Sequence, residues 1–297
     1  MADTKFGHFL KKLKYEESNG EYMTMPTGAD MEGIDLSFAW GYRRQPGIWG
    51  GGDGATMHAH PYGECLVFVG LDYDNPNSFD AEIEICMGEK GEKHVIDSPS
   101  VVILPPGLPH CPLTTTKVEK PFGFLAISLS GEHKSSEVTP SGTSPSSGLE
   151  YEHLIKKLDM HDTKRTKGGN ADFIDGWNGK DIDGLNVNFT WAFHSGLGAW
   201  HDKDPHVHTY DEALLFVGSD PDKPDDLGAE LSIGMEDEVY IMDTPTVVIA
   251  PKNVVHCPLI TRRVDRPYLF SAICLSTGHD TKWLGEESGK SEPAFDK

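Results

Sequence analysis

Short apolar runs bounded by glycine, proline or polar residues dominate the chain. Segment 37–42 alternates small with aromatic side chains, which is the period-two pattern of a half-buried strand. Strand-sized runs also occupy 65–69, 81–86, 94–96, 100–104 and 122–129. Only 6–13 and its counterpart 151–158 show a helical pattern. Many short strands at even spacing predict a β-sandwich or a β-barrel.

The chain contains the same module twice. Segment 97–113, DSPSVVILPPGLPHCPL, matches 243–259, DTPTVVIAPKNVVHCPL, and 58–70 matches 206–218. The offset between matching residues stays between 145 and 151 along the chain. A collinear match of this length indicates a tandem duplication of one domain-sized module.

The duplication predicts where the modules begin and end. We expect an N-terminal module over 1–134 and a C-terminal module over 150–278. Between them, 135–149 is rich in Ser, Thr, Pro and Gly and has little to bury, which predicts a flexible linker. The charged segment 279–297 is expected to be a weakly ordered tail.

The composition indicates which classes of partner the protein can bind and in which cellular compartment it is expected. The chain has 26 Lys and Arg against 47 Asp and Glu, a net charge of −21, so it should repel nucleic acids and anionic membranes. No apolar run approaches the ~20 residues that cross a bilayer, and the N-terminus lacks the apolar core of a signal peptide. Five cysteines without paired spacing do not suggest a disulfide framework. We therefore expect a cytoplasmic protein with reduced thiols.

One constellation of histidines and a glutamate occurs in both modules. In the first, His58 and His60 are followed by Glu64 and, much later, by His110. The second repeats the pattern with His206, His208, Glu212 and His256. Because residues i and i+2 of a strand project from the same face, paired histidines at this spacing can meet one ion.

The recurrence of this pattern in both modules favours a metal site over a chance pair of histidines. A single HxH motif also occurs on ordinary surface strands, but here all four groups persist while the loops have diverged. Three imidazoles and one carboxylate suit a divalent first-row metal, namely Fe, Mn, Ni, Co, Cu or Zn. The sequence therefore predicts up to two metal ions per chain.

These residues resemble the motifs of the cupin superfamily in its two-domain, bicupin form. The first motif runs from Gly52 through His58, His60 and Glu64 to Gly70, and the second comprises Pro105, Gly107 and His110. The resemblance covers about residues 30–130 and 181–276. It implies an all-β chain of two tandem jelly-roll barrels with a few short helices and a metal inside each barrel. It also implies Fe or Mn as the metal, and a tendency to form homo-oligomers.

The match has departures. Thr114 and Ile260 stand where many cupins have Asn, and Asn253 replaces Gly107 in the second module. Asn tolerates the left-handed turn conformation, so the last change is mild. These departures leave the four ligands intact, but they argue against a close match to an oxalate decarboxylase or a seed storage protein.

Three further residues are candidates for binding a substrate carboxylate. If the strand after His256 stays regular, Arg262 points into the barrel, and Thr114 and Thr116 do so in the first module. The alternative for Arg262 is a position in water beyond the strand end. Arg43 and His194 occupy corresponding positions opposite the aromatic stripe of each module and carry the same two interpretations. The stripe consists of Phe38, Trp40 and Tyr42 in the first module and Phe189, Trp191 and Phe193 in the second.

Cys111 and Cys257 each follow a ligand histidine, so a thiolate ligand is conceivable. Strand alternation instead turns the neighbour of an inward residue outward, and free cysteines are commonly buried. We interpret both as buried, inert thiols.

Two classes of function fit these features. The first is a metal-dependent enzyme acting on a small organic acid, enol or diketone. The resemblance implies a dioxygenase or decarboxylase, and a redox-neutral lyase or isomerase is the alternative. The second is a non-catalytic bicupin that binds a small ligand or a metal. The fold alone does not decide between them, and the complete ligand set in both modules favours the enzyme.

Overall fold

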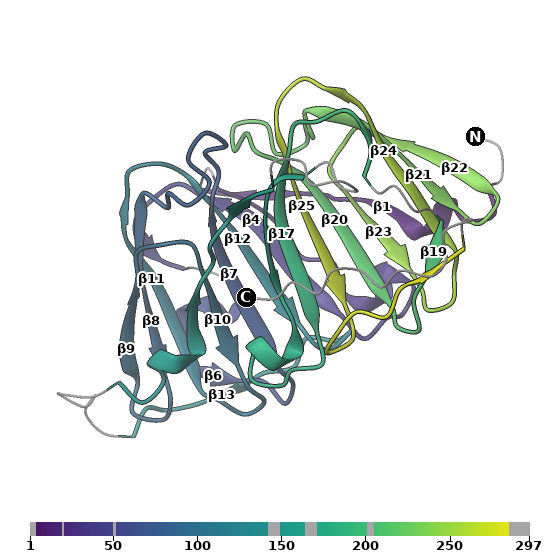
Figure 1. Cartoon of the computed structure of the whole chain (residues 1–297). Coiled ribbons are helices and arrows are strands. Elements are labelled where there is room, and N and C mark those ends of the chain that lie inside the picture. The colour runs from purple at the N-terminus through teal and green to yellow at the C-terminus, as the bar shows by residue number, and fades with distance from the viewer. Residues whose placement is uncertain are drawn as a thin grey trace. The chain divides into compact units, whose positions relative to one another are not determined.

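The computed structural model of the 297-residue chain describes residues 4–19, 21–49, 52–141, 149–163, 171–200 and 205–284. Its paired strands are all antiparallel and form four sheets (Figure 1). The expected all-β class is confirmed. The helices in this part of the chain are short 3₁₀ turns: η1 (Gly7–Phe9), η2 (Gly28–Met31), η3 (Gly52–Ala55), η4 (Glu152–Leu154) and η5 (Gly179–Asp181). Residues 142–148 of the expected linker and 285–297 of the expected tail lie outside the described residues.

The chain divides into two compact units. The N-terminal barrel consists of Glu16–Ala29 and Asp35–Asp159. The C-terminal barrel consists of Met1–Tyr15, Asp30–Ile34 and Met160–Lys297. Each barrel therefore contains the N-terminal segment of the other module.

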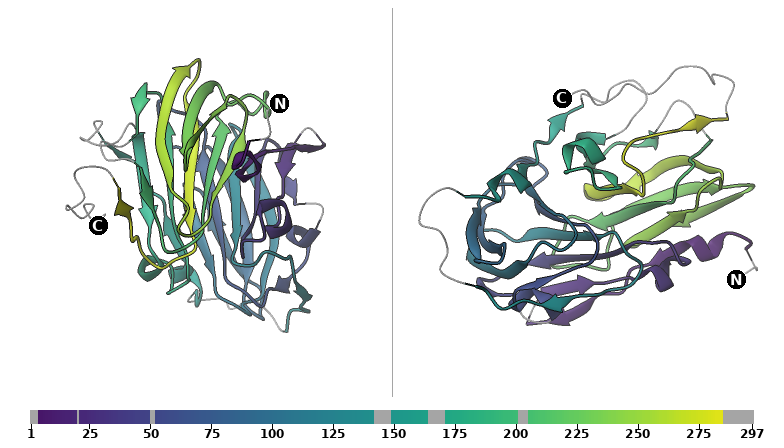
Figure 2. Two further views of the ribbon diagram at one scale, coloured as in Figure 1. Left: turned by 90° about the vertical axis from the view of Figure 1, so that its right-hand side faces the viewer. Right: turned by 90° about the horizontal axis from the view of Figure 1, so that it is seen from below.

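Two sheets build the N-terminal barrel. The larger has the order β14 (Ile155–Lys157), β10 (Ser100–Leu104), β7 (Glu64–Gly70), β12 (Phe122–Ser128), β4 (Ser37–Arg43), β3 (Glu21–Thr24), β2 (Glu16–Ser18). The smaller has the order β13 (Ser136–Glu137), β6 (His58–Ala59), β11 (His110–Val118), β8 (Ala81–Met87), β9 (Glu92–Ile96), with β5 (Gly47–Ile48) also paired to β11. In the right panel of Figure 2, the blue strands of this barrel curve round an interior.

The C-terminal barrel repeats this plan. Its larger sheet has the order β1 (Leu10–Lys12), β23 (Thr246–Ala250), β20 (Glu212–Gly218), β25 (Tyr268–Cys274), β17 (Asn188–His194), β16 (Ala171–Trp177), β15 (His161–Asp162). Its smaller sheet has the order β22 (Glu238–Met242), β21 (Ala229–Met235), β24 (His256–Val264), β19 (His206–Val207), β26 (Lys282–Trp283), with β18 (Gly198–Ala199) paired to β24.

Alternating side chains place the core between the two sheets of each barrel. In β8 the residues Ala81, Ile83, Ile85 and Met87 are buried, while those between them are only half-buried. This is the pattern of a sheet with one face on the core and one on solvent. In the N-terminal barrel these residues pack with Phe68 and Phe124 from the larger sheet, and Ile233 and Phe216 do the same in the C-terminal barrel.

The segments expected to be helical form a 3₁₀ turn followed by a strand. β1 extends the larger sheet of the C-terminal barrel by pairing with β23, so that Leu10 lies opposite Val248 (Figure 1). β14 pairs with β10 in the N-terminal barrel, with Ile155 opposite Val102. The helix prediction was wrong because an exposed sheet edge supplies backbone partners that a short segment lacks alone.

A glutamate on the edge of each smaller sheet holds the exchanged segment. The Glu92 carboxylate accepts hydrogen bonds from the backbone N–H groups of Glu150 and Tyr151, both at 3.0 Å. In the C-terminal barrel, Glu238 accepts from the N–H groups of Lys5 and Phe6 at 3.2 and 3.1 Å. In both barrels, therefore, a glutamate at the sheet edge binds backbone N–H groups in the N-terminal segment of the other module.

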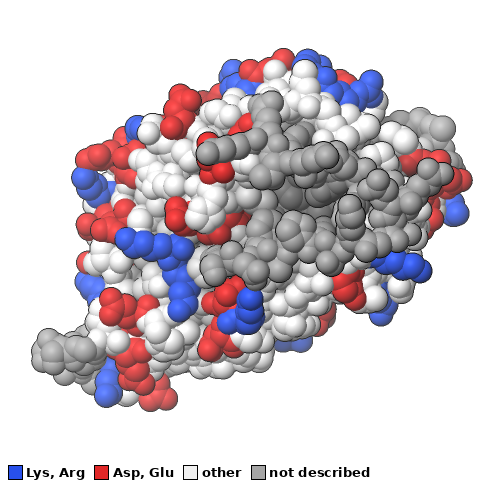
Figure 3. Space-filling view, in the orientation of Figure 1, with Lys and Arg blue, Asp and Glu red and all other residues white. Residues whose placement is uncertain are grey.

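Charged side chains of both signs lie on the face of the protein drawn in Figure 3. In the view of Figure 3, acidic and basic side chains are interspersed, and neither forms a continuous field on this face. Within the described residues, no helix is long and apolar enough to cross a membrane. The five cysteines, which all fall in the described ranges, form no disulfide.

Candidate metal centres

Three strands of the N-terminal barrel bring the four predicted ligands to one place. His58 begins β6 and lies directly opposite His110, the first residue of β11, in the smaller sheet. Glu64 begins β7 in the larger sheet, and His60 lies in the short connection between β6 and β7. The cluster therefore joins the two sheets at one end of the barrel.

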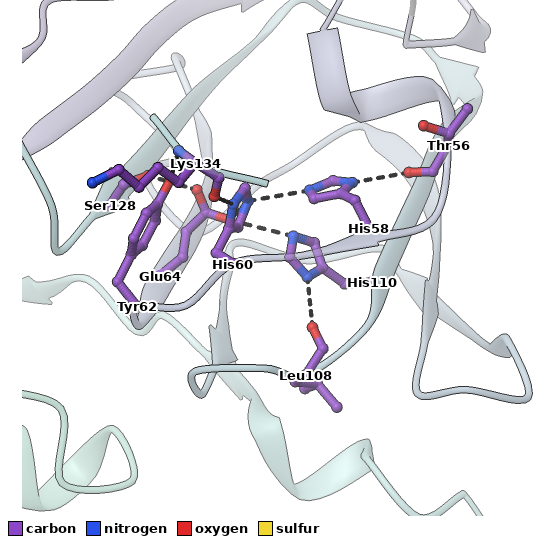
Figure 4. Close-up of polar contacts among 9 residues, drawn as sticks. All are labelled: Thr56, His58, His60, Tyr62, Glu64, Leu108, His110, Ser128 and Lys134. Atoms are coloured by element: carbon purple, nitrogen blue, oxygen red, sulfur yellow. Dashed lines mark hydrogen bonds and ion pairs between the residues drawn. The ribbon is translucent and has the colours of Figure 1, made fainter. Parts of the chain in front are cut away.

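The donor atoms of this cluster converge (Figure 4). His58 Nε2 lies 3.1 Å from His60 Nε2. Glu64 Oε2 lies 3.6 Å from His60 Nε2 and 3.5 Å from His110 Nε2. All four residues are buried, with exposed fractions of 2–7%. Three ring nitrogens and one carboxylate oxygen thus face one point that is largely shielded from water.

Backbone carbonyl groups determine which ring nitrogen of each histidine carries the hydrogen. The Nδ1 atoms of His58, His60 and His110 lie 2.8–2.9 Å from the carbonyl oxygens of Thr56, Lys134 and Leu108, respectively (Figure 4). A carbonyl oxygen can only accept, so each Nδ1 is the donor. In a neutral ring the Nε2 atom then presents its lone pair to the cluster, which is the tautomer of a metal-binding histidine.

Glu64 is held ionised. Burial alone would raise its pKa, but His110, His60 and the Ser128 hydroxyl together lower the pKa below its ordinary value. The Ser128 hydroxyl donates to Glu64 Oε1 at 2.7 Å, which leaves Oε2 turned toward the histidines. The glutamate is therefore a carboxylate in the neutral range, as a ligand must be.

The C-terminal barrel repeats the arrangement. His206 in β19 lies opposite His256 in β24, and Glu212 begins β20. Glu212 Oε2 lies 3.6 Å from His208 Nε2 and 3.2 Å from His256 Nε2. Burial would raise the pKa of Glu212, but His256, His208 and His206 outweigh it, and the pKa is lowered.

The histidines of this second cluster are also oriented by backbone carbonyl groups. His256 Nδ1 lies 3.1 Å from Val254 O, and His208 Nδ1 lies 3.3 Å from Asp280 O. Burial lowers the pKa of His208, although Glu212 opposes this. The neutral form that a metal requires is therefore favoured.

A left-handed turn positions the second motif in both barrels. Gly107 has φ +81° and its N–H group donates to His60 O at 2.8 Å. Asn253 has φ +64° and donates to His208 O at the same distance. The expectation that Asn would tolerate this turn is confirmed, because its short polar side chain accepts the left-handed conformation.

Ligand atoms lie within 4.8 Å of one another in three groups of the described residues. These groups are His58, His60 and His110; His208, Glu212 and His256; and His206, His256 and Cys257. The eight predicted ligands are thus brought together as two clusters, one in each barrel.

Sequence reasoning missed the side chains that surround the ligands. Tyr62 stacks on His60 with ring centroids 5.0 Å apart, and Tyr210 stacks on His208 at 4.8 Å. His133 lies 5.4 Å from His60, on the segment that precedes β13. A signal was available for the tyrosines, because both follow the second histidine of the HxH motif by two residues.

Arg43 is buried, but it lies at the opposite end of its barrel from the cluster. Glu64 lies opposite Ser128, the last residue of β12, whereas Arg43 lies opposite Phe122, the first. Those two positions are six residues apart, which corresponds to roughly 20 Å along the strand. Arg43 Nη1 pairs with Glu21 Oε2 at 2.6 Å. The structure therefore does not bring Arg43 to the histidines.

His194 occupies the equivalent place in the C-terminal barrel. His194 lies opposite Tyr268, the first residue of β25. Glu212 lies opposite Cys274, the last residue of the same strand. The His194 ring stacks on Trp200 at 3.9 Å and on Tyr268 at 5.3 Å. His194 is thus part of an aromatic stack remote from the cluster.

Arg262 lies on the outer surface. Its side chain is 45% exposed, and its Nε atom lies 3.4 Å from Glu230 Oε1. β24 has one extra residue between His256 and Leu259 relative to β21, and this bulge reverses which side chains face inward. Thr261 is consequently buried and Arg262 is not.

The same bulge occurs in β11 between His110 and Leu113. Thr115 is buried and accepts a hydrogen bond from the indole of Trp49, while Thr116 is exposed. The expectation that Thr114 and Thr116 point inward with His110 was wrong, because it assumed a regular strand.

The bulges also change the interpretation of the cysteines. Cys111 and Cys257 are buried as expected, but they belong to the interior cores of their barrels rather than to the outward faces. The outward direction was wrong because alternation does not hold at the bulge.

Comparisons with known proteins agree with this architecture. No protein-family model and no curated protein matches the sequence. Among solved structures, a point mutant of Bacillus subtilis oxalate decarboxylase matches with a TM-score of 0.62 and 12% identity, covering 93% of this chain and 79% of that one. Lactobacillus farciminis oxalate decarboxylase in complex with formate matches with a TM-score of 0.61 and 11% identity, covering 93% and 88%. Likeness at this level of identity shows the fold alone.

Proposed function

Since this chain has the bicupin fold, we propose that each barrel binds one divalent transition-metal ion and that the protein is a metal-dependent enzyme acting on a small organic acid. The ligands in the N-terminal barrel are His58, His60, Glu64 and His110. Those in the C-terminal barrel are His206, His208, Glu212 and His256. Manganese is the first metal to test, because one of the matching structures belongs to work on the Mn(II) centres of Bacillus subtilis oxalate decarboxylase. Iron is the second, because the resemblance to cupins implies either metal.

The observation that carries the metal assignment is the contact between His58 and His60. Both rings donate from Nδ1 to backbone carbonyls, so their Nε2 lone pairs face each other at 3.1 Å with Glu64 beside them. Neutral rings at this distance repel through their lone pairs, and protonated rings would repel through their charges, so the buried arrangement is costly in either form. A cation between them removes the repulsion and uses all four donors.

The four ligand residues of each barrel would hold the metal, which would then be able to bind a substrate. When bound, the metal supplies Lewis-acid polarisation of the substrate's carboxylate or carbonyl oxygens. The chain's own residues orient the ligands, exclude water through the stacked Tyr62 and Tyr210, and keep Glu64 and Glu212 ionised. Burial of the whole cluster strengthens every electrostatic interaction there.

Oxalate is the first substrate to test, because the matching structures named above are oxalate decarboxylases. In that reaction the carbon–carbon bond of hydrogen oxalate breaks to give carbon dioxide and formate. Other short organic acids, enols and diketones form the wider panel. Oxygen consumption in the same assays separates a decarboxylase from a dioxygenase.

Metal content measured by elemental mass spectrometry tests the proposal. We expect up to two Mn or Fe per chain in protein purified without oxygen, one fewer in His58→Ala and one fewer in His206→Ala. His153→Ala, which changes an exposed histidine on η4, is the matched control and should lose none. Folded protein that takes up no divalent metal after reconstitution would refute the proposal. Metal binding without consumption of any substrate in the panel would leave a binding protein.

A further inference from the structure

The two candidate centres differ at one position that contacts the ligand carboxylate. In the N-terminal barrel, the Ser128 hydroxyl donates to Glu64 Oε1 at 2.7 Å. In the C-terminal barrel, the Cys274 thiol donates to Glu212 Oε1 at 3.2 Å. The other oxygen of each carboxylate, Oε2, faces the histidines.

The serine and the cysteine are structural equivalents. Ser128 is the last residue of β12 and lies opposite Glu64 in β7. Cys274 is the last residue of β25 and lies opposite Glu212 in β20. Both are buried, Cys274 completely. The duplication thus provides two copies of one site in which the atom that donates to the glutamate is changed from oxygen to sulfur.

We propose that the exchange of Ser128 for Cys274 makes the C-terminal centre bind hard divalent ions such as Mn²⁺ more weakly than the N-terminal centre. This inference rests on the proposed metal binding. Ser128 and Cys274 are positioning residues, because they contact the ligand glutamate and act through it.

The physical reason is the strength of the hydrogen bond. A hydroxyl that donates to a carboxylate at 2.7 Å forms a short, charge-assisted bond that fixes the orientation of the ligand. A thiol is a weak donor, so its contact with the carboxylate restrains the ligand less than a hydroxyl does. Partners that orient a metal ligand are worth about 10- to 100-fold in metal affinity, so replacing a strong donor by a weak one should cost part of that factor.

Reciprocal exchange in single-site proteins tests the inference. His206→Ala leaves only the N-terminal centre, and His58→Ala leaves only the C-terminal one. In these backgrounds we expect Ser128→Cys to weaken Mn²⁺ binding about threefold to tenfold and Cys274→Ser to tighten it by a similar factor. The Kd is measured from the electron paramagnetic resonance signal of free Mn²⁺, and the spectrum of bound Mn²⁺ should change with each exchange.

Alanine variants and unfolding measurements separate this effect from packing. Ser128→Ala should weaken Mn²⁺ binding more than Cys274→Ala does, because it removes the stronger donor. The urea midpoint of each metal-free variant shows whether the barrel is intact.

The outcome that would contradict the inference differs from the outcome that would contradict the proposed function. Kd values that stay within about twofold after both exchanges, or exchanges that both weaken binding, would overturn the inference while leaving metal binding in place. If neither single-site protein binds Mn²⁺ or another divalent metal, the proposed function itself fails.

Discussion

Replacing Glu92 should weaken the attachment of the exchanged segment to the N-terminal barrel. The Glu92 side chain is buried and accepts backbone hydrogen bonds from Glu150 and Tyr151, both at 3.0 Å. It also lies 2.8 Å from His94 Nε2. In Glu92→Ala, two N–H groups lose a charged acceptor, and the adjacent strand β14 loses its anchor to β9.

The magnitude follows from these contacts. A hydrogen bond to a charged group contributes about 1.5–3 kcal/mol, so the loss of two predicts a destabilisation of ~3–6 kcal/mol. Glu92→Gln keeps one acceptor oxygen and should lose about half of that. Glu89→Gln removes an exposed charge in the turn between β8 and β9, and is the matched control with no expected change.

Urea unfolding followed by tryptophan fluorescence measures the effect. We expect a lower midpoint for Glu92→Ala with an unchanged slope, because the loss is in stability and not in the surface exposed on unfolding. A midpoint equal to that of Glu89→Gln would refute the claim that the carboxylate holds the segment.

Acid titration checks the same group independently. Burial would raise the pKa of Glu92, but the N–H groups of Tyr151 and Glu150 and the nearby His94 lower it below its ordinary 4.5. A carboxylate with a lowered folded pKa contributes stability that is present above the unfolded pKa and is lost as the pH falls through the folded value. Wild-type protein should therefore lose stability below about pH 4.5 more steeply than Glu92→Gln.

Three further predictions concern the core and the centres. Gly123→Ala should destabilise the N-terminal barrel by about 1–3 kcal/mol, because a Cβ atom there would lie 2.5 Å from the Trp40 ring, whereas Gly278→Ala has open space and should be neutral in the same urea experiment. Removing bound metal with a chelator should lower the free energy of unfolding by about 2.7 kcal/mol for a metal previously held at about 100 times its Kd, and calorimetry that shows no shift would contradict metal binding. Arg262→Gln removes an exposed partner of Glu230 and should leave metal content and turnover unchanged, so a large loss of activity would show that Arg262 does reach the substrate.

Sequence patterns were sufficient for the architecture and for the clustering of the predicted ligand residues. Period-two alternation predicted the strands, because a strand with one buried face must alternate. The duplicated spacing of His58, His60, Glu64 and His110 predicted a cluster, and the structure brings these residues together in both barrels. These features are local, or they are repeated in the chain, so the amino-acid order itself carries them.

Only the tertiary structure decided which further residues belong to the centres. The bulge that follows His110 in β11 and the one that follows His256 in β24 reversed the faces of Thr116 and Arg262, since the side-chain period of a strand is two. Arg43 lies on an inward face but at the wrong end of a seven-residue strand. Ser128 and the Lys134 carbonyl group that orients His60 approach from segments distant in the sequence, where the tertiary structure sets the contact. Composition and spacing determine which groups can meet, whereas register and bulges determine which of them do.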